Sequence, residues 1–334
     1  MIFLGILDFL KFFGGLALFL FGMKMMSAEL EKSAGGRLKD IMARFTKNKY
    51  KSFLSGFVST AAVQSSSAVT VMTVGFVNSG IMSLKGAVGV IIGSNVGTTA
   101  TSWLLGLSGI GSGNIFLELL KPASLASIAA VAGLVINEVH KKKGGSKQSI
   151  ASALIGFAVL MFGMETMSGS VTGLKDEEWF LSSMLIFSRP ATGLFAGILL
   201  TALMQSSSAS VGMLQALSVT GSLSYGACIP IVLGQNIGTC VTTLIASAGA
   251  GKNAKCAALI HLYFNLLSAI VFGALTFAVY KTANLPLFAE PANGVGIAAI
   301  HTSFNIFAAL FMMPLSEKLE TLAIKTASLK KNIA

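Results

Sequence analysis

Gln64-Ser65-Ser66-Ser67-Ala68 stands inside an apolar stretch, residues 52–80, and the same five letters return as Gln205-Ser206-Ser207-Ser208-Ala209 inside residues 190–220. A polar group without a partner in hydrocarbon costs several kcal/mol, so such a run needs a structural reason. Bonding back to its own helix is reason enough for one serine. Three consecutive serines point in different directions around a helix. We therefore predict that the helix breaks at each run.

Two further motifs return at the same offset of 141 residues. Phe21-Gly22-Met23 returns as Phe162-Gly163-Met164, and Gly93-Ser94-Asn95-Val96-Gly97-Thr98 returns as Gly234-Gln235-Asn236-Ile237-Gly238-Thr239. Three separate motifs that keep one offset indicate two copies of one unit. In the longer motif, we expect Gly97 and Gly238 to loosen a helix.

The composition is that of an integral membrane protein. Hydrophobic residues make up 54% of the 334 residues and charged residues 11%, which is well below the charged share of about 25% in soluble domains. Nine segments approach or exceed the roughly 20 apolar residues that a spanning helix needs. They are residues 2–26, 52–80, 86–108, 121–139, 149–171, 190–220, 225–249, 254–281 and 293–315.

The net charge of +11 does not indicate nucleic-acid binding, because the basic residues lie in short segments between apolar ones. An excess of Lys and Arg there marks the cytoplasmic side of a membrane protein. The three cysteines, Cys228, Cys240 and Cys256, form no metal-binding spacing and are interpreted as packing residues.

The charges of equivalent loops predict opposite orientations for the two copies. Residues 24–51 hold eight basic and three acidic residues, whereas the equivalent residues 165–192 hold two basic and four acidic residues. The positive-inside rule places the first loop in the cytoplasm and the second outside, which is the pattern of an inverted repeat. The predicted fold class is an all-α integral membrane protein with an inverted two-fold repeat.

The predicted layout has four parts. Residues 1–140 form the first membrane repeat, 141–148 a basic cytoplasmic linker and 149–282 the second repeat; 283–334 hold a final transmembrane helix and a basic cytoplasmic tail. The location is then the inner (cytoplasmic) membrane, with several passes and a cytoplasmic C-terminal tail.

The polar runs suggest an ion site. The first N–H groups of a helix that begins within the membrane carry partial positive charge and bind anions, and hydroxyl groups add donors. Side-chain amide and hydroxyl oxygens suit a hard cation such as sodium.

His261-x-x-x-Asn265 and His301-x-x-x-Asn305 are interpreted as polar cross-links between helices, with a proton-coupled or gating role as the alternative.

These paired motifs resemble those of the type II sodium–phosphate cotransporters and their bacterial relatives, over roughly residues 14–315. The resemblance implies inward transport of inorganic phosphate with sodium ions. It implies re-entrant helical hairpins with the QSSS runs at their tips, beside broken transmembrane helices. Phosphate binding is implied for six serines: Ser65, Ser66, Ser67, Ser206, Ser207 and Ser208. Sodium binding is implied for Gln64, Gln205, Asn95, Asn236, Thr98, Thr239 and Thr242.

Thr99 is matched by Cys240, and because a thiol is a poor sodium ligand, we expect no coordination at that position in the second copy.

The leading hypothesis is a sodium-coupled phosphate symporter that uses Na⁺ as its coupling ion and no cofactor. Its partners are inorganic phosphate, sodium ions and the lipid bilayer, with no nucleic acid; a homo-oligomer stays open. The alternative is an anion channel or uniporter for a small oxyanion. A membrane-embedded serine hydrolase is a third hypothesis, although nothing in the sequence brings His261 or His301 near a serine nucleophile. The sequence holds no ATP-binding loop or zinc-hydrolase motif.

Overall fold

The computed structural model describes residues 2–44, 48–107, 122–140, 145–174, 177–283 and 285–329. The regular elements among these residues are helices, together with an isolated bridge between Ser224 and Pro291. The first part of the chain forms α1 (Ile2–Arg44), α2 (Lys49–Val63), α3 (Ser66–Asn78), α4 (Leu84–Gly106) and α6 (Pro122–His140).

The second part repeats this order and then extends it. It forms α7 (Ser146–Leu174), α8 (Glu178–Phe187), α9 (Pro190–Met204), α10 (Ser207–Ser218) and α11 (Tyr225–Ser247). After these come α12 (Lys252–Ala283), the short 3₁₀ helix η2 (Pro286–Phe288), α13 (Gly294–Met312) and α14 (Ser316–Leu329). Helices α9, α10 and α11 each begin 141 residues after α2, α3 and α4, so the sequence repeat is also a repeat of helix boundaries.

Six of the described helices are long and apolar enough to cross a membrane, namely α1, α4, α7, α11, α12 and α13. The number becomes seven if α8 and α9, bent by 96° at a short break, make one span. Large apolar side chains such as Phe21, Leu203 and Leu310 are exposed on the helices, as lipid contact requires. The chain is a multi-pass membrane protein.

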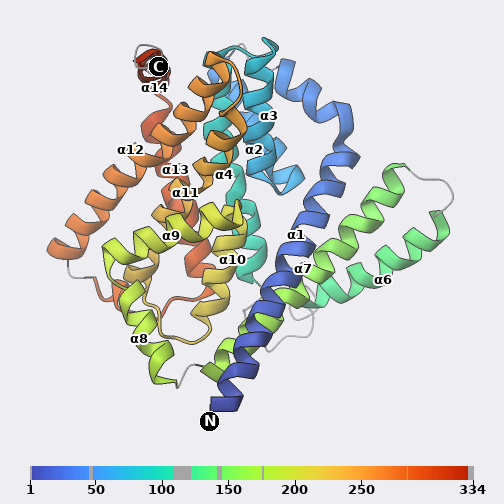
Figure 1. Ribbon diagram of the computed structural model, residues 1–334, viewed down its shortest axis with the longest axis vertical. Coiled ribbons are helices and arrows are strands. Elements are labelled where there is room, and N and C mark those ends of the chain that lie inside the picture. The colour runs from blue at the N-terminus through green and yellow to red at the C-terminus, as the bar shows by residue number, and fades with distance from the viewer. Residues whose placement is uncertain are drawn as a thin grey trace.

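Helices α1 and α7, which carry the repeated Phe-Gly-Met motifs, lie side by side and run in opposite directions (Figure 1). Ser33 near one end of α1 hydrogen-bonds to Ser146 at the start of α7, 3.0 Å away. A Cβ on Gly163 would collide with the backbone of Phe19, and one on Gly22 with the backbone of Leu160. The glycine in each motif therefore allows two helix backbones to touch.

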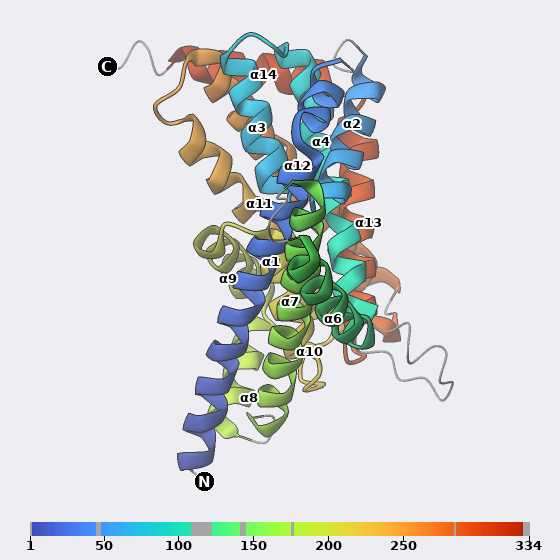
Figure 2. The same cartoon turned by 90° about the vertical axis from the view of Figure 1, so that its right-hand side faces the viewer.

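The α2–α3 pair and the equivalent α9–α10 pair lie at different heights in the molecule. In both Figure 1 and Figure 2, α2 and α3 lie in the upper half, α9 lies near the middle and α10 lies in the lower half. The C-terminal part of α1 and α14 also lie at the upper end, and α8 lies at the lower end.

The two segments expected to be loops are largely helical, so that part of the prediction was wrong. Residues 24–44 continue α1, which bends at Gly35, where φ is 52°. Good helix formers dominate this stretch, and its apolar side chains Leu38 and Met42 are buried. In the second copy α7 continues to Leu174 and α8 follows it. Charge alone does not interrupt a helix that leaves the membrane.

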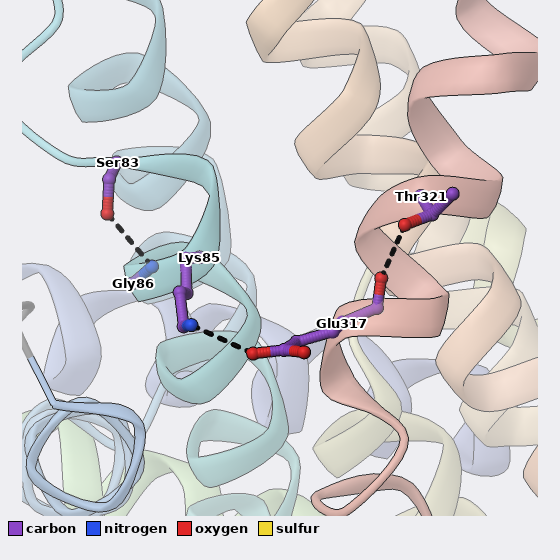
Figure 3. Close-up of polar contacts among 5 residues, drawn as sticks. All are labelled: Ser83, Lys85, Gly86, Glu317 and Thr321. Atoms are coloured by element: carbon purple, nitrogen blue, oxygen red, sulfur yellow. Dashed lines mark hydrogen bonds and ion pairs between the residues drawn. The ribbon is translucent and has the colours of Figure 1, made fainter.

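The basic linker Lys141-Lys142-Lys143 and the tail lysines Lys330 and Lys331 lie outside the described residues. The tail lysines follow the helix α14, which packs on α4 and α12. Figure 3 shows how it is attached: Lys85 in the first turn of α4 donates to Glu317 of α14 over 2.9 Å. This hydrogen bond and the lysine charge lower the pKa of Glu317, so the contact weakens as the pH falls through that lowered pKa.

Candidate functional site

The helix breaks at both QSSS runs, and the two breaks have the same backbone conformation. Gln64 (φ 57°, ψ 28°) and Gln205 (φ 53°, ψ 27°) adopt the left-handed conformation, and the next residues, Ser65 and Ser206, are extended. Among the described residues, these two glutamines are the only non-glycine residues with positive φ. Each left-handed residue costs roughly 1–2 kcal/mol, and such strain is concentrated at functional sites.

The first break is held by the side chain of Gln64. Its amide nitrogen donates to Ala61 O over 2.6 Å, and Thr101 Oγ1 on α4 donates to its Oε1 over 2.9 Å. A glycine would adopt this backbone conformation more easily but could form neither bond. Gln205, in contrast, is exposed in the second break.

The two breaks, 141 residues apart in sequence, touch each other. Ser67 Oγ donates to the backbone oxygen of Gln205 over 3.1 Å. Helix α3 packs against α11 of the other copy, and α10 packs against α4. Gln215 of α10 extends this contact by donating to Ser102 O of α4 over 2.9 Å. The copies are therefore interleaved at the breaks.

The six serines of the runs differ in what their hydroxyl groups do. Ser65 and Ser206 cap α3 and α10, since each side-chain oxygen accepts from the backbone N–H three residues later over 3.2 Å. Ser66, Ser207 and Ser208 are buried, and their hydroxyl groups form no hydrogen bond with the rest of the described chain. These three hydroxyls stand at the positive ends of two helices with their donors uncommitted.

Helices α4 and α11 are uninterrupted through their Asn-x-Gly-Thr motifs, so the expectation that Gly97 and Gly238 loosen the helix was wrong. A Cβ on Gly97 would lie 2.7 Å from Phe57 O, and one on Gly238 would lie 2.5 Å from Ile198 O. These glycines let α4 approach α2 and let α11 approach α9. Of the two types of motif, the QSSS runs break a helix and the Asn-x-Gly-Thr motifs do not.

The polar side chains of these helices present oxygen atoms. Asn95 and Asn236 each donate their amide N–H to a carbonyl one turn earlier, over 3.3 and 2.9 Å. Thr98 and Thr239 likewise donate to their own helices, over 3.1 and 2.9 Å. Because the donors are used within the helix, the amide oxygens and the hydroxyl lone pairs remain, and these are ligands for a hard cation.

The copies differ in how well their polar groups are paired. In the first copy, Thr60 Oγ1 lies 2.8 Å from Ser94 Oγ, and Thr101 bonds to Gln64. In the second copy the equivalent atoms Thr201 Oγ1, Gln235 Oε1 and Thr242 Oγ1 are buried and have no partner in the described chain. Unpaired buried oxygens are costly, so each of these three atoms is a candidate cation ligand.

Two histidines, His261 and His301, cross-link equivalent positions, as the favoured interpretation predicted. Ser102 Oγ of α4 lies 2.7 Å from His301 Nδ1 of α13. Thr243 Oγ1 of α11, which is 141 residues later, lies 3.0 Å from His261 Nδ1 of α12. Each histidine thus holds a motif helix one turn beyond its Asn-x-Gly-Thr segment.

Substitution of either histidine by alanine is expected to destabilise the protein. His301→Ala leaves the buried Ser102 hydroxyl without its partner, at a cost of about 1–3 kcal/mol. His261→Ala should cost less, because Thr243 Oγ1 keeps its hydrogen bond to Cys240 O. Thermal unfolding of the purified protein in detergent measures the change. His140→Ala is the control, because His140 bonds only to Ile136 O within its own helix. Equal unfolding temperatures for all three variants would contradict the cross-linking role.

Comparison with known proteins assigns the family. A family model described as Na+/Pi-cotransporter matches residues 18–169 and 178–313, which is most of the chain. The chain belongs to the Na+/Pi-cotransporter family. This family is one of transporters and not of enzymes, so the serine-hydrolase hypothesis is set aside. The family also supports phosphate and sodium as the transported species.

Several relatives are similar to this family member over part or most of its length. The uncharacterized protein YqeW of Bacillus subtilis is 29% identical over 89% of this chain and 91% of its own. The putative inorganic phosphate export protein YjbB of Salmonella typhimurium is 25% identical over 93% of this chain but 54% of its own. Rat sodium-dependent phosphate transport protein 2A is 38% identical over 34% of this chain and 18% of its own. No solved structure matches the chain significantly.

Some contacts in this family member were not predicted from the sequence. Helix α1 touches both breaks: Ser27 Oγ donates to Gln64 O over 3.3 Å, and Ser206 Oγ approaches Met23 Sδ at 3.7 Å. Gln235 takes the place of Ser94 in the second copy, and the 141-residue alignment was the signal that could have identified it. Nothing in the sequence pointed to Ser27.

Proposed function

We propose that this protein is a sodium-coupled symporter that imports inorganic phosphate across the cytoplasmic membrane, with phosphate bound between the two QSSS motifs. The observation that supports it most is the hydrogen bond between Ser67 and Gln205, which joins the two motifs. A site between them would receive donors from both halves of the chain.

The phosphate would be held by hydroxyl and backbone N–H groups. Ser66, Ser207 and Ser208 have uncommitted hydroxyl donors, and the first turns of α3 and α10 have N–H groups without helical acceptors. Two helix N-termini add partial positive charge without a buried Lys or Arg. Ser65 and Ser206 would then support the site indirectly by capping these helices, while Ser67 would contribute at the contact between the runs.

The sodium ions would be held by neutral oxygen atoms. Asn95, Asn236, Thr98 and Thr239 offer amide and hydroxyl oxygens from α4 and α11. Gln64 and Gln205 add side-chain oxygens at the breaks. Thr242 supplies an unpaired buried oxygen in the second copy, and so do Thr201 and Gln235.

The two copies, residues 1–140 and 149–282, would form an inverted repeat, as in many secondary transporters. The antiparallel packing of α1 on α7 supports this arrangement. So do the different placements of α2–α3 and α9–α10, which would be re-entrant hairpins with their tips at the QSSS runs (Figure 2). The basic part of α1 and the end that carries α14 would face the cytoplasm.

Export is a second candidate for the direction of transport. YjbB, which is named a putative inorganic phosphate export protein, is similar over 93% of this chain. A carrier coupled to sodium runs in whichever direction the combined gradients favour. An inward sodium gradient therefore predicts import, and a carrier without sodium coupling would follow the phosphate gradient alone.

Uptake of radiolabelled phosphate into proteoliposomes tests the proposal. With sodium outside and none inside, we expect phosphate to accumulate above its external concentration, and with choline in place of sodium, we expect no accumulation. Passive equilibration in both buffers would indicate a channel or uniporter. Release of preloaded phosphate against its own gradient, with no inward accumulation, would favour an exporter.

Sodium is also expected to stabilise the protein through Thr242. A ligand at about 100 times its dissociation constant raises the free energy of unfolding by about 2.7 kcal/mol. Thr242→Ala should keep the unfolding temperature measured in choline and lose at least half of the rise that sodium produces. Thr276→Ala, whose hydroxyl bonds only within α12, should keep the full rise. An unchanged sodium effect in Thr242→Ala would exclude this residue as a ligand.

A further inference from the structure

A large apolar cavity lies away from the QSSS runs, between α9, α11, α12 and η2. Its volume is about 910 Å³, and it is lined mainly by carbon atoms. On α12 the lining residues recur every three or four positions along one face of the helix. They are Leu266, Ala269, Ile270, Gly273, Thr276, Phe277 and Tyr280. Among the described residues, no charged side chain lines the cavity, so its interior does not suit a free inorganic ion.

The cavity is as long as one leaflet of a bilayer. The lining runs from Leu266 to Tyr280 on α12, which corresponds to about 21 Å of helix. On α11 it runs from Ser224 to Ile237, which corresponds to about 20 Å. Half of a bilayer of roughly 40–45 Å, headgroups included, has the same length. An elongated molecule oriented like a lipid therefore fits this cavity.

One end of the cavity is polar and lies next to two basic residues. Ser188, Ser224 and Tyr280 line it there, and the rings of Tyr280 and Phe288 meet with centroids 5.6 Å apart. Arg189 lies in sequence between the lining residues Ser188 and Pro190. Lys281 lies 5.7 Å over the ring of Phe277.

These two cations have no carboxylate within ion-pair distance among the described residues, although Glu290 follows the lining residue Ala289 in sequence. Aromatic rings and cations at one end of an apolar groove are typical of the membrane interface. The opposite end, at Leu233, Ile237 and Leu266, is apolar. The cavity thus has the polarity of a lipid with an anionic headgroup.

We propose that this cavity is a binding site for one anionic phospholipid of the leaflet on the α8 side. Its phosphate would lie near Arg189 and Lys281, with an acyl chain along the Leu266–Tyr280 face of α12. Figure 1 shows α12 at the side of the molecule, with its C-terminal end toward α8. This site is separate from the QSSS runs and does not depend on the direction or coupling of transport.

Photo-crosslinking in nanodiscs tests the site. The protein is reconstituted with phosphatidylglycerol that carries a diazirine in its acyl chain, irradiated, digested and mapped by mass spectrometry. We expect adducts concentrated on the lining face of α12 and on α11. Gly273→Phe should reduce them at least about fivefold by filling the groove, because a side chain there meets only the movable Leu233 Cδ1 at 3.3 Å. Leu275→Phe, on the exposed face of the same helix, should leave them unchanged.

Thr276→Leu serves as a second groove-filling variant if Gly273→Phe does not fold. A headgroup test uses Arg189→Gln and Lys281→Gln, each of which should lower the preference for phosphatidylglycerol over phosphatidylcholine by about fivefold, the equivalent of about 1 kcal/mol per basic residue. Adducts spread evenly over exposed residues such as Leu275, or adducts unaffected by the groove-filling variants, would overturn the proposal.

Discussion

Replacing either Ser66 or Ser207 by alanine is expected to lower the kcat/KM of phosphate transport by about 10- to 100-fold. A hydrogen bond to a charged group contributes about 1.5–3 kcal/mol, and 1.4 kcal/mol corresponds to a factor of ten. Both hydroxyl groups are buried at the start of a helix and have no other partner in the described chain. Initial rates of sodium-driven phosphate uptake into proteoliposomes measure the effect.

The matched control for this prediction is Ser79→Ala. Ser79 follows α3 on the exposed surface, and its hydroxyl donates to Phe76 O within the same turn. Its substitution should change uptake by less than about twofold, in keeping with surface substitutions of within 0.5 kcal/mol. If Ser66→Ala impaired transport and Ser207→Ala did not, phosphate would be bound by one half of the chain only.

Replacing Gly93 or Gly234 by alanine is expected to prevent folding or to destabilise the protein by more than about 3 kcal/mol, because overpacking against backbone leaves no side chain that can move aside. A Cβ on Gly93 would collide with the carbonyl of Phe53, and one on Gly234 with the carbonyl of Leu194. Helices α2 and α4, and their counterparts α9 and α11, would have to separate. Yield of monodisperse protein and its thermal unfolding temperature are the measurements.

Gly75→Ala provides the control for the glycine prediction. Gly75 lies within α3, and a Cβ there meets no atom within 4 Å. Since alanine is favoured over glycine inside a helix by roughly 0.5–1 kcal/mol, this variant should fold and be slightly more stable. Normal folding of Gly93→Ala and Gly234→Ala would show that the backbones are not in contact at these points.

The helix breaks could be predicted from the sequence because their cause is local. The QSSS runs place consecutive polar groups where a membrane helix could not satisfy them, and the structure breaks both helices there. The repeat was equally visible, because three motifs share one offset. Six of the nine apolar segments gave spanning helices, because length and composition decide whether a helix is stable in a bilayer. Segments 52–80 and 190–220 are each divided into two helices, and segment 121–139 forms the shorter helix α6.

The errors concern features that depend on contacts between helices. Gly97 and Gly238 would loosen an isolated helix, but in the folded chain they allow a neighbouring backbone to approach, and that packing keeps the helix intact. Residues 24–44 were assigned to a loop from their charges, whereas Leu38 and Met42 bury themselves and continue the helix. The helices against which these residues pack cannot be identified from the sequence of the segment that contains them.

The residue types of the candidate site follow from the chemistry of the motifs. The hydrogen-bond partners of these residues do not, because they depend on contacts between helices. The bond of Ser102 to His301 joins residues 199 positions apart, and the contact of Ser67 with Gln205 joins residues 138 positions apart. Only the folded chain could show that Ser65 and Ser206 are used as helix caps.

Equilibrium binding of radiolabelled phosphate to the purified protein at saturating sodium is the most direct test of a single site shared by both QSSS runs. The shared site predicts one phosphate per chain, with binding weakened at least about tenfold when either Ser66 or Ser207 becomes alanine. Two phosphates per chain, or wild-type affinity in either variant, would contradict it.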